Sequence, residues 1–330
     1  MTVRISGTGR ALPDRRLLTR DIERDLGLAP GRLERATGVV ARHVCGSEDQ
    51  VSMGVAAARA ALADAGLEAG EIDTVICGAA VPYQPIPATA PLVMRGLGMA
   101  DGAAGAFDVN STCLSFVTAF ETAARQIAAG AADHVLVVSS EVASRALPWA
   151  SDPETAALFG DGAGAAVLSR AGDGEPCGVV ASLLRSYPSA YAACGIGAGG
   201  TRFDFVTQAQ EFAEHSLFAM DGKALFRLAA QHFGGFVAEL LDRAGWRPGE
   251  VDLVVPHQAS PAGLAHMIRL TGFAPDRVVN IATSHGNQIA ASIPFALDMA
   301  RREGRVWPGA RVLMLGTSAG VSFGGLALVA

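Results

Sequence analysis

The sequence predicts an α/β fold made of two copies of one half, packed together as a layered sandwich. Residues 61–80 (ALADAGLEAGEIDTVICGAA) and 239–259 (ELLDRAGWRPGEVDLVVPHQA) each contain an amphipathic helix ending at Ala-Gly, a turn with Gly-Glu and a β-branched strand. Asp73 in the first copy matches Asp252 in the second, and the offset between the copies is constant at 179 residues. Because the turn residues match as well as the hydrophobic period, duplication explains the likeness better than chance does.

The two halves also end alike. HVLVVSSE (134–141) leads to a glycine-rich GDGAGAAVLS run, and RVLMLGTS (311–318) leads to a second glycine-rich run, AGVSFGGLALV. Valine- and leucine-rich runs flanked by glycine are typical of strands that are covered on both faces. The turn-rich stretch AGDGEP (171–176) separates the halves, so we expect one unit over residues 1–172 and another over residues 173–330.

The composition is typical of a compact α/β enzyme. The 330 residues are 50% hydrophobic and only 18% charged, and they include 39 glycines, which argues against a disordered or coiled-coil protein. A net charge of −6 argues against a nucleic-acid partner, whose phosphates require a basic face. The absence of a leader and of a long apolar run predicts a cytoplasmic protein with no membrane partner. Five scattered cysteines without metal-type spacing indicate neither a disulfide framework nor a zinc site. We expect no metal and no cofactor.

Cys113 is a candidate nucleophile. It lies in NSTCLSF (110–116), between a strand-like AFDV (106–109) and an apolar helical run that ends at Gly130. A thiol at the N-terminus of a helix faces unpaired backbone N–H groups and the positive end of the helix dipole, which lower its pKa. A cysteine in an apolar helix is also a common packing residue, so this cue alone leaves both interpretations open.

His257 and Asn287 also lie where strands should end. His257 follows the buried strand VDLVVP (251–256), at the edge where α/β proteins bind ligands. Asn287 follows a second predicted strand, VVNIA (278–282), and precedes an apolar helix, which makes it the expected counterpart of Cys113 in the duplicate. A structural histidine and a helix cap are the alternatives for the two residues taken singly. A thiol, an imidazole and an amide form a known catalytic grouping, and we expect all three in one pocket.

The ordered segments of this chain resemble those of the thiolase superfamily, in its β-ketoacyl-acyl-carrier-protein synthase III branch. The resemblance implies a thiolase-like duplicated five-layer αβαβα sandwich. The segments that carry it span nearly the whole chain: ISGTGRALP (5–13), RATGVVARHV (35–44), FDVNSTCLSF (107–116), FGDGAGAAVL (159–168), VVPHQAS (254–260), SHGNQIAAS (284–292) and GTSAGVSFGGLALV (316–329).

The resemblance implies a ketosynthase III-like acyltransferase. Cys113 would take an acyl group from a thioester, while His257 and Asn287 would assist decarboxylation of a malonyl-type extender and stabilise its enolate. Backbone N–H groups of Cys113 and Ala319 would form the oxyanion hole. This reaction would serve fatty-acid initiation or, more in keeping with changes at two coenzyme A-binding positions, a specialised polyketide-type pathway. Acyl transfer to oxygen or nitrogen and non-decarboxylative condensation of two acyl thioesters remain alternatives, whereas a non-catalytic subunit is disfavoured because all three residues are present.

Two departures concern the acyl donor. Leu33 stands where family members have an aromatic residue against the adenine of coenzyme A, and Pro153 stands where they have an arginine. Their loss removes a stacking contact, including a cation–π contribution of about 0.5–2 kcal/mol. We therefore expect an acyl donor bound to an acyl carrier protein, or an acyl-coenzyme A that is held differently.

The resemblance also implies further contacts. Ile86 and Thr317 are smaller than the aromatic residues that relatives have at these positions, which suggests a longer or bulkier acyl chain. For the expected aromatic pocket residues, such as Phe218, a place in the hydrophobic core is the alternative. Carrier docking is expected from arginines around His257, namely Arg243, Arg247 and Arg269. A homodimer is implied, with the apolar segment 82–94 at its seam. The expected substrate-binding residues are Ile86, Phe159, Phe218, Met220, Phe226, Ser260 and Thr317.

Overall fold

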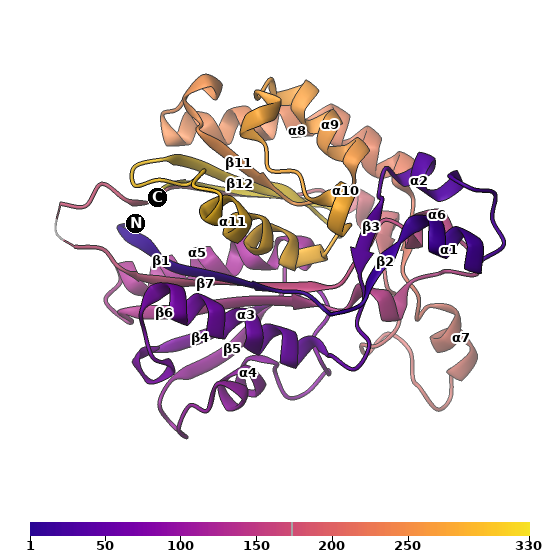
Figure 1. The fold of residues 1–330 in the computed structure, drawn as a ribbon, viewed down its shortest axis with the longest axis horizontal. Helices are drawn as coiled ribbons and strands as arrows, with labels where there is room; N and C mark the ends of the chain where they lie inside the picture. Colours follow the sequence, from indigo (N-terminus) through magenta and orange to yellow (C-terminus); the bar gives the residue numbers. More distant parts are fainter. Residues whose placement is uncertain (173) are drawn as a thin grey trace.

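The computed structural model describes residues 1–172 and 174–330. It shows five layers in which two β-sheets alternate with three layers of helices (Figure 1). The expected boundary at residue 173 falls on a position outside the described residues. Among the described residues, no helix combines the length and the apolar character that a membrane crossing requires.

The two sheets repeat one pattern of strands. The first has the order β1-β7-β6-β4-β5, and the second has the order β8-β13-β12-β11. In both sheets the first pairs are antiparallel and the last are parallel, as for β4 with β6 and β11 with β12. The strands are β1 (Val3–Ala11), β4 (Thr74–Gly78), β5 (Gly105–Val109), β6 (His134–Glu141), β7 (Gly162–Arg170), β8 (Gly178–Ser186), β11 (Leu253–Pro256), β12 (Arg311–Ser318) and β13 (Ser322–Val329).

The helices form one layer between the sheets and one outside each (Figure 1). The central layer is α5 (Ser115–Ala128) with α11 (Ser292–Arg302); the outer layers are α3 (Gln50–Ala65) with α4 (Ala90–Leu97), and α8 (Gly222–Ala244) with α9 (Pro261–Thr271). Along β6, Val135 and Val137 contact the central layer, whereas Leu136 and Val138 contact the outer one. This alternation explains why the strand reads as a continuous apolar run: successive side chains point to opposite faces, and both faces are covered.

The chain also contains shorter elements, and those of them that Figure 1 labels lie on its right. They are β2 (Arg16–Leu18), α1 (Thr19–Asp25), α2 (Arg32–Thr37), β3 (Ala41–His43), α6 (Pro153–Ala156), β9 (Cys194–Gly195), α7 (Ala209–Glu214), β10 (Ala219–Met220) and α10 (Ala282–His285). Two 3₁₀ turns, η2 (Thr112–Leu114) and η7 (Ile289–Ala291), lead directly into α5 and α11.

Side-chain hydrogen bonds confirm the predicted duplication. The Asp73 carboxylate accepts the N–H of His134 at 2.9 Å, and the matching Asp252 carboxylate accepts the N–H of Arg311 at 2.8 Å. His134 and Arg311 are the first residues of β6 and β12, so the same aspartate fixes the start of the same strand in both halves.

The strand expected over residues 278–282 is absent. Val278 makes an isolated parallel bridge to Val254, and the chain then enters α10. The reason is Gln258, which is fully buried and whose Oε1 accepts the N–H groups of Ile281 and Ala282 at 2.9 and 3.1 Å. A side chain thus satisfies the donors that a strand would have paired with its neighbour.

Candidate active site

Cys113 lies in the turn η2, one residue after a strained position. Thr112 has φ of 51°, a conformation that β-branched residues rarely adopt. Two hydrogen bonds hold it there: its N–H donates to Asn110 Oδ1 at 2.9 Å, and its hydroxyl donates to the carbonyl of Ala319 at 3.2 Å. The Cys113 thiol consequently faces two backbone N–H groups, its own and that of Ala319.

His257 follows β11 and packs against β12. A Cβ at Gly316 would lie 2.5 Å from the Cβ of His257, so only glycine leaves room for the imidazole at this point. One ring nitrogen lies against the backbone of Ile289, whereas Nδ1 is buried without a hydrogen-bond partner among the described residues. A buried ring nitrogen without a partner is free to bind a substrate atom.

Asn287 is held by the same residue as His257. The N–H of Ile289 donates to Asn287 Oδ1 at 2.8 Å, and Ile289 has φ of 51°, as Thr112 does. The Asn287 side chain is buried, with 6% of the residue exposed. Because η2 packs against both η7 and β12, the structure brings the segments that carry Cys113, His257 and Asn287 together.

The pKa expected for Cys113 is wrong. The pKa of the thiol is raised to about 12; burial is the largest cause, followed by the charge of Glu141 and the nearby thiol of Cys194. The N–H groups of Ala319 and Cys113 lower it, as a helix end should, but loss of solvent outweighs them. Cys113 is therefore protonated at neutral pH while the site is empty.

Burial has the opposite effect on the imidazole. It lowers the pKa of His257 to about 4, although the Ile289 backbone partly offsets it. His257 is therefore neutral at physiological pH and presents one N–H and one lone pair. A neutral imidazole can accept the proton of a thiol.

The structural counterpart of Cys113 in the second half is Ala290, not Asn287. Asn287 corresponds to Asn110, because their Oδ1 atoms accept the N–H groups of the equivalent residues Ile289 and Thr112. The signal was present in the sequence as Asn…Ser spaced by five in NSTCLS (110–115) and NQIAAS (287–292). The prediction failed because it matched Cys113 to the polar residue at the second strand-to-helix junction, and this match is too imprecise to align the two halves residue by residue.

Comparisons with known proteins match this arrangement to one family. The family model described as 3-oxoacyl-[acyl-carrier-protein (ACP)] synthase III matches residues 107–188, and the model of its C-terminal part matches residues 241–330. A protein named Beta-ketoacyl-[acyl-carrier-protein] synthase III 3, from Streptomyces coelicolor, is 38% identical over 326 residues, covering 98% of this chain and 96% of that protein. The chain belongs to the 3-oxoacyl-[acyl-carrier-protein] synthase III family. It is an acyltransferase of the condensing-enzyme type.

Solved structures confirm the thiolase-like five-layer sandwich. The 3-oxoacyl-[acyl-carrier-protein] synthase III from Aquifex aeolicus superposes with a TM-score of 0.89 at 31% identity, covering 99% of this chain and 100% of that chain. The priming β-ketosynthase from the R1128 polyketide biosynthetic pathway superposes with a TM-score of 0.91 at 29% identity, covering 99% of this chain and 96% of that chain.

Two expected pocket residues lie beside the candidate catalytic group. Phe159 forms a backbone bridge with Asn287, and its ring meets that of Phe218 edge-on at 5.1 Å between centroids. Both belong to an apolar cluster that includes Ile289. Met220 pairs with Cys194 in the small β9–β10 sheet, which approaches the Cys113 thiol.

The other expected pocket residues have different surroundings. Ser260 caps α9, its Oγ accepting the N–H of Gly263 at 3.0 Å. Ile86 is 85% exposed in the loop before α4, and Phe226 is half exposed and stacks on His266 at 4.0 Å. Thr317 lies in β12 opposite Phe323.

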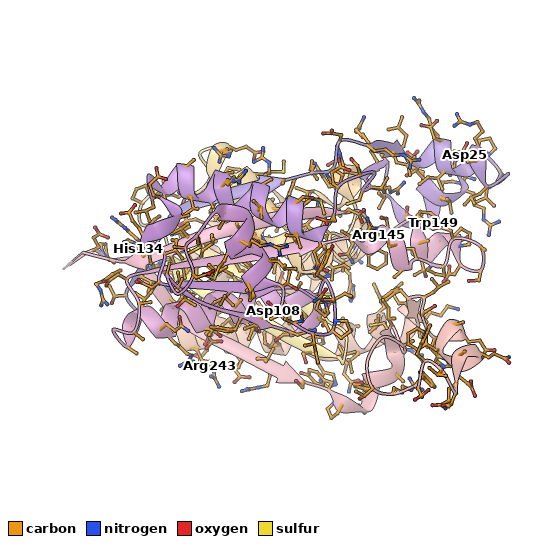
Figure 2. The ribbon with its side chains drawn as sticks, turned by 90° about the horizontal axis from the view of Figure 1, so that it is seen from below. Asp25, Asp108, His134, Arg145, Trp149 and Arg243 are labelled. Atoms are coloured by element: carbon orange, nitrogen blue, oxygen red, sulfur yellow. The ribbon has the colours of Figure 1, made fainter. Side chains whose placement is uncertain are left out.

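The expected position of two docking arginines is wrong. Arg243 and Arg247 flank the amino end of β11, whereas His257 follows its carboxyl end, and both are bonded to acidic neighbours on their own segments. Figure 2 shows Arg243 toward the side where His134 begins β6, away from Arg145 and Trp149. Arg269 lies exposed on α9, near His266. Closeness to His257 in sequence did not translate into closeness in space.

Two cations that sequence reasoning missed lie at the start of α8. Lys223 and Arg227, one turn apart, line a hollow of about 560 Å³ together with Gly222 and Phe226. This end of α8 follows the β9–β10 sheet that approaches the thiol. The signal in the sequence was a pair of cations at helical spacing, four residues apart, just before the long apolar run of α8.

Leu33 is fully buried, packed with Ile22 and Ala157, and offers no surface to a ligand. Beside it, Arg32 on α2 forms an ion pair with Glu154 on α6 at 3.1 Å. Pro153 is the first residue of α6.

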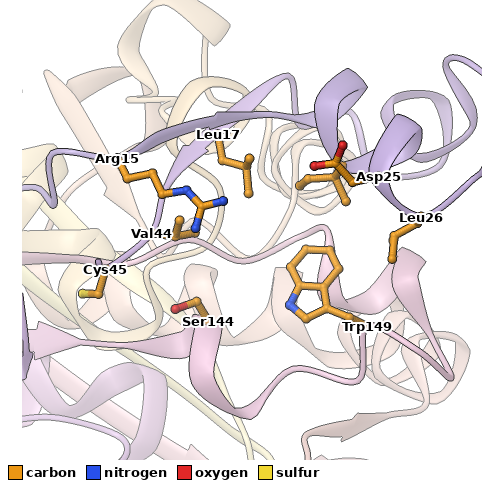
Figure 3. Close-up of a pocket in the computed structure, with 9 residues that line it drawn as sticks. Arg15, Leu17, Asp25, Leu26, Val44, Cys45, Ser144 and Trp149 are labelled. Carbon is orange, nitrogen blue, oxygen red and sulfur yellow. The ribbon is translucent and has the colours of Figure 1, made fainter. Parts of the chain in front are cut away.

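A second hollow, of about 310 Å³, opens on this same side of the molecule (Figure 3). Trp149, Arg15 and Asp25 line it, along with apolar side chains from β2 and α1. Cys113 and His257 line neither this hollow nor the one at α8. Within the described residues, no group of three His, Cys, Asp or Glu side chains is placed to hold a metal ion.

Proposed function

We propose that this enzyme joins an acyl group on Cys113 to a malonyl-type thioester by decarboxylative Claisen condensation. The observation that carries the proposal is the arrangement around Ile289: one residue holds both His257 and Asn287, and its turn packs against the turn that presents the thiol between two N–H groups. We assign the thiol to a first unit, residues 1–172, and the imidazole and amide to a second, residues 173–330.

The first half-reaction loads Cys113. Because burial keeps the thiol protonated in the empty site, its proton must leave as the sulfur attacks the thioester, and the neutral His257 is the base placed to accept it in that step. The sulfur attacks the thioester carbonyl, and the oxyanion formed accepts the N–H groups of Cys113 and Ala319. The carbon–sulfur bond of the donor then breaks, and the departing thiolate takes the proton back from His257.

The second half-reaction forms the carbon–carbon bond. Asn287 donates its amide N–H to the thioester carbonyl of the malonyl group, and His257 donates a second hydrogen bond in the tautomer whose proton is on the substrate-facing ring nitrogen. The bond to the carboxylate breaks, carbon dioxide leaves, and the electron pair becomes an enolate. The enolate carbon attacks the acyl carbonyl, the bond to Cys113 breaks, and the released thiolate takes a proton from solvent. Two neutral donors are suited to this step because they stabilise the enolate oxygen where its charge develops.

An intact-mass experiment tests the reaction type. Wild-type enzyme loaded with an acyl group is offered a malonyl carrier, an alcohol or an amine, and the mass at Cys113 and the released carbon dioxide are followed. Discharge onto the malonyl carrier with carbon dioxide supports the proposal. Discharge onto the alcohol or amine without carbon dioxide supports acyl transfer instead, and discharge by a second acyl thioester without carbon dioxide supports non-decarboxylative condensation.

We propose that the acyl donor is bound to an acyl carrier protein. Leu33 is buried, and the Arg32–Glu154 ion pair ties α2 directly to α6, so these segments leave no aromatic slot for adenine. Faster loading of Cys113 from acyl-coenzyme A than from the same acyl group on a carrier would contradict this. In that case the hollow of Figure 3 is where we would place the nucleotide, since Trp149 offers a stacking face and Arg15 a cation.

We place the carrier on the cations Lys223, Arg227 and Arg269, because the first two line the hollow at the start of α8 and the acidic carrier requires a basic partner. Use in a specialised pathway, a bulkier acyl chain beside Phe159 and Phe218, and a homodimer are further parts of the proposal. Exposed apolar side chains in the segment 82–94, Ile86 above all, support the dimer, and sedimentation of the purified enzyme tests it.

A further inference from the structure

Glu141 is a buried acid that the condensation described above does not use. It is the last residue of β6 and is 1% exposed. Its carboxyl accepts the N–H of Ala80 at 2.6 Å, and the N–H groups of Val81 and Ala290 also face it. Three backbone donors surround this carboxyl, and among the described residues no basic side chain pairs with it, so it is not part of a structural ion pair.

The duplication relates the position of Glu141 to that of the oxyanion hole. Glu141 ends β6 as Ser318 ends β12, and Ala290 is the counterpart of Cys113. The N–H of Cys113 in the first half and the N–H of Ala319, which follows Ser318 in the second half, both face the thiol. In the second half, the N–H of Ala290 faces the carboxyl of Glu141. The N–H that corresponds to the Cys113 donor of the oxyanion hole is therefore bonded to the protein's own acid.

Ala290 directly follows Ile289, whose strained backbone holds Asn287 and His257. A β-branched residue does not keep φ near 51° without bonds that fix its neighbours. The carboxyl of Glu141 supplies one of these bonds from the opposite half of the molecule.

We propose that Glu141 is a positioning residue for condensation: by accepting the N–H of Ala290, it fixes the Ile289 turn and through it Asn287 and His257. The inference rests on the proposed function. It goes beyond it by assigning a role to a residue that touches neither the acyl group nor the extender in that mechanism.

Electrostatics supports this placement. The pKa of Glu141 is raised to about 8: burial is the largest cause and Asp161 adds to it, while the backbone donors partly offset both. After burial, the charge of Glu141 is the largest influence that raises the pKa of Cys113; Cys194 also contributes. Replacing Glu141 with a neutral residue should therefore loosen the Ile289 turn. Above about pH 8, where Glu141 is ionised, the replacement should also favour the Cys113 thiolate.

The test separates the two half-reactions in wild type, Glu141→Gln and Glu141→Ala. Loading of Cys113 is followed by intact mass, and condensation by release of carbon dioxide from a malonyl carrier. For Glu141→Gln we expect the loading rate to stay within about threefold of wild type or to rise. We expect the condensation rate to fall by about tenfold or more, which is the effect of losing one well-placed hydrogen bond. Glu141→Ala should lose more condensation, because glutamine still offers one acceptor oxygen.

Asp298→Asn is the matched control. Asp298 is a fully buried acid on α11, the helix that Ala290 leads into, and it binds Thr8 and Arg302 away from the thiol. This variant should lower stability but leave the ratio of condensation to loading unchanged. Equal losses of both half-reactions in Glu141→Gln, or rates equal to wild type in both, would overturn the proposal.

Alkylation of Cys113 by iodoacetamide gives a readout that needs no substrate. In Glu141→Gln, alkylation should reach half its maximal rate at a lower pH than in wild type, and in Asp298→Asn it should not shift. An unshifted profile in Glu141→Gln contradicts the placement beside the thiol. If the wild-type enzyme releases no carbon dioxide, the proposed function is wrong. In that case the pH profile of alkylation alone shows whether Glu141 influences the Cys113 thiol.

Discussion

Replacing Gly316 with alanine should displace His257. A Cβ at this position would lie 2.5 Å from the His257 Cβ and 3.4 Å from its backbone nitrogen, and real Cβ atoms do not approach closer than 3.0 Å. The imidazole must therefore move by roughly half an ångström or more, and misplacement by about 1 Å costs on the order of 100-fold in rate. Overpacking of a core position should also cost about 1–3 kcal/mol of stability.

The assay measures loading and condensation separately, together with the melting temperature. We expect both half-reactions of Gly316→Ala to fall, by about 10- to 100-fold for condensation, because His257 serves in both steps. Gly235→Ala is the control: it lies within α8 with no atom near the added methyl, and alanine there should stabilise the helix by about 0.5–1 kcal/mol. A Gly316→Ala enzyme that condenses at the wild-type rate would refute the assignment of His257.

Three further predictions concern the same site and its approach. Asn287→Ala should keep loading within about threefold but slow condensation by about 100- to 1000-fold, as loss of one oxyanion donor does; equal losses would contradict its role. The pKa of His257 is about 4 in the folded protein and 6.5 in the free side chain. The neutral imidazole therefore contributes fully to the free energy of unfolding above pH 6.5, and this contribution falls as the pH drops toward 4. Melting temperatures of wild type and His257→Gln, measured between these two pH values, test this. Arg227→Glu should slow loading from the carrier about tenfold at low salt. Arg243→Glu should not.

The fold was predictable because its evidence is local and repeated. The helix–turn–strand units around Asp73 and Asp252 recur with the same turn residues, and the apolar runs of β6 and β12 mark strands covered on both faces. The expected strand over residues 278–282 failed because a distant side chain, Gln258, takes its backbone donors. No local pattern reports such a contact.

The candidate site was predictable in composition but not in electrostatics. Cys113 and His257 each follow a strand end and Asn287 follows α10, and the structure brings their segments together. The sign of the Cys113 pKa shift was missed because burial, which the sequence does not show, outweighs the helix end. Glu141 was missed because its partner Ala290 lies in the other half of the chain.

The central claim is most directly tested by counting carbon dioxide released for each acyl group discharged from Cys113. Wild-type enzyme is loaded to completion, freed of excess donor and mixed with malonyl carrier labelled in its free carboxyl carbon. The mechanism predicts one labelled carbon dioxide for each acyl group that leaves the thiol, and a product on the carrier heavier by the acyl group. Discharge of Cys113 with no labelled carbon dioxide would contradict it.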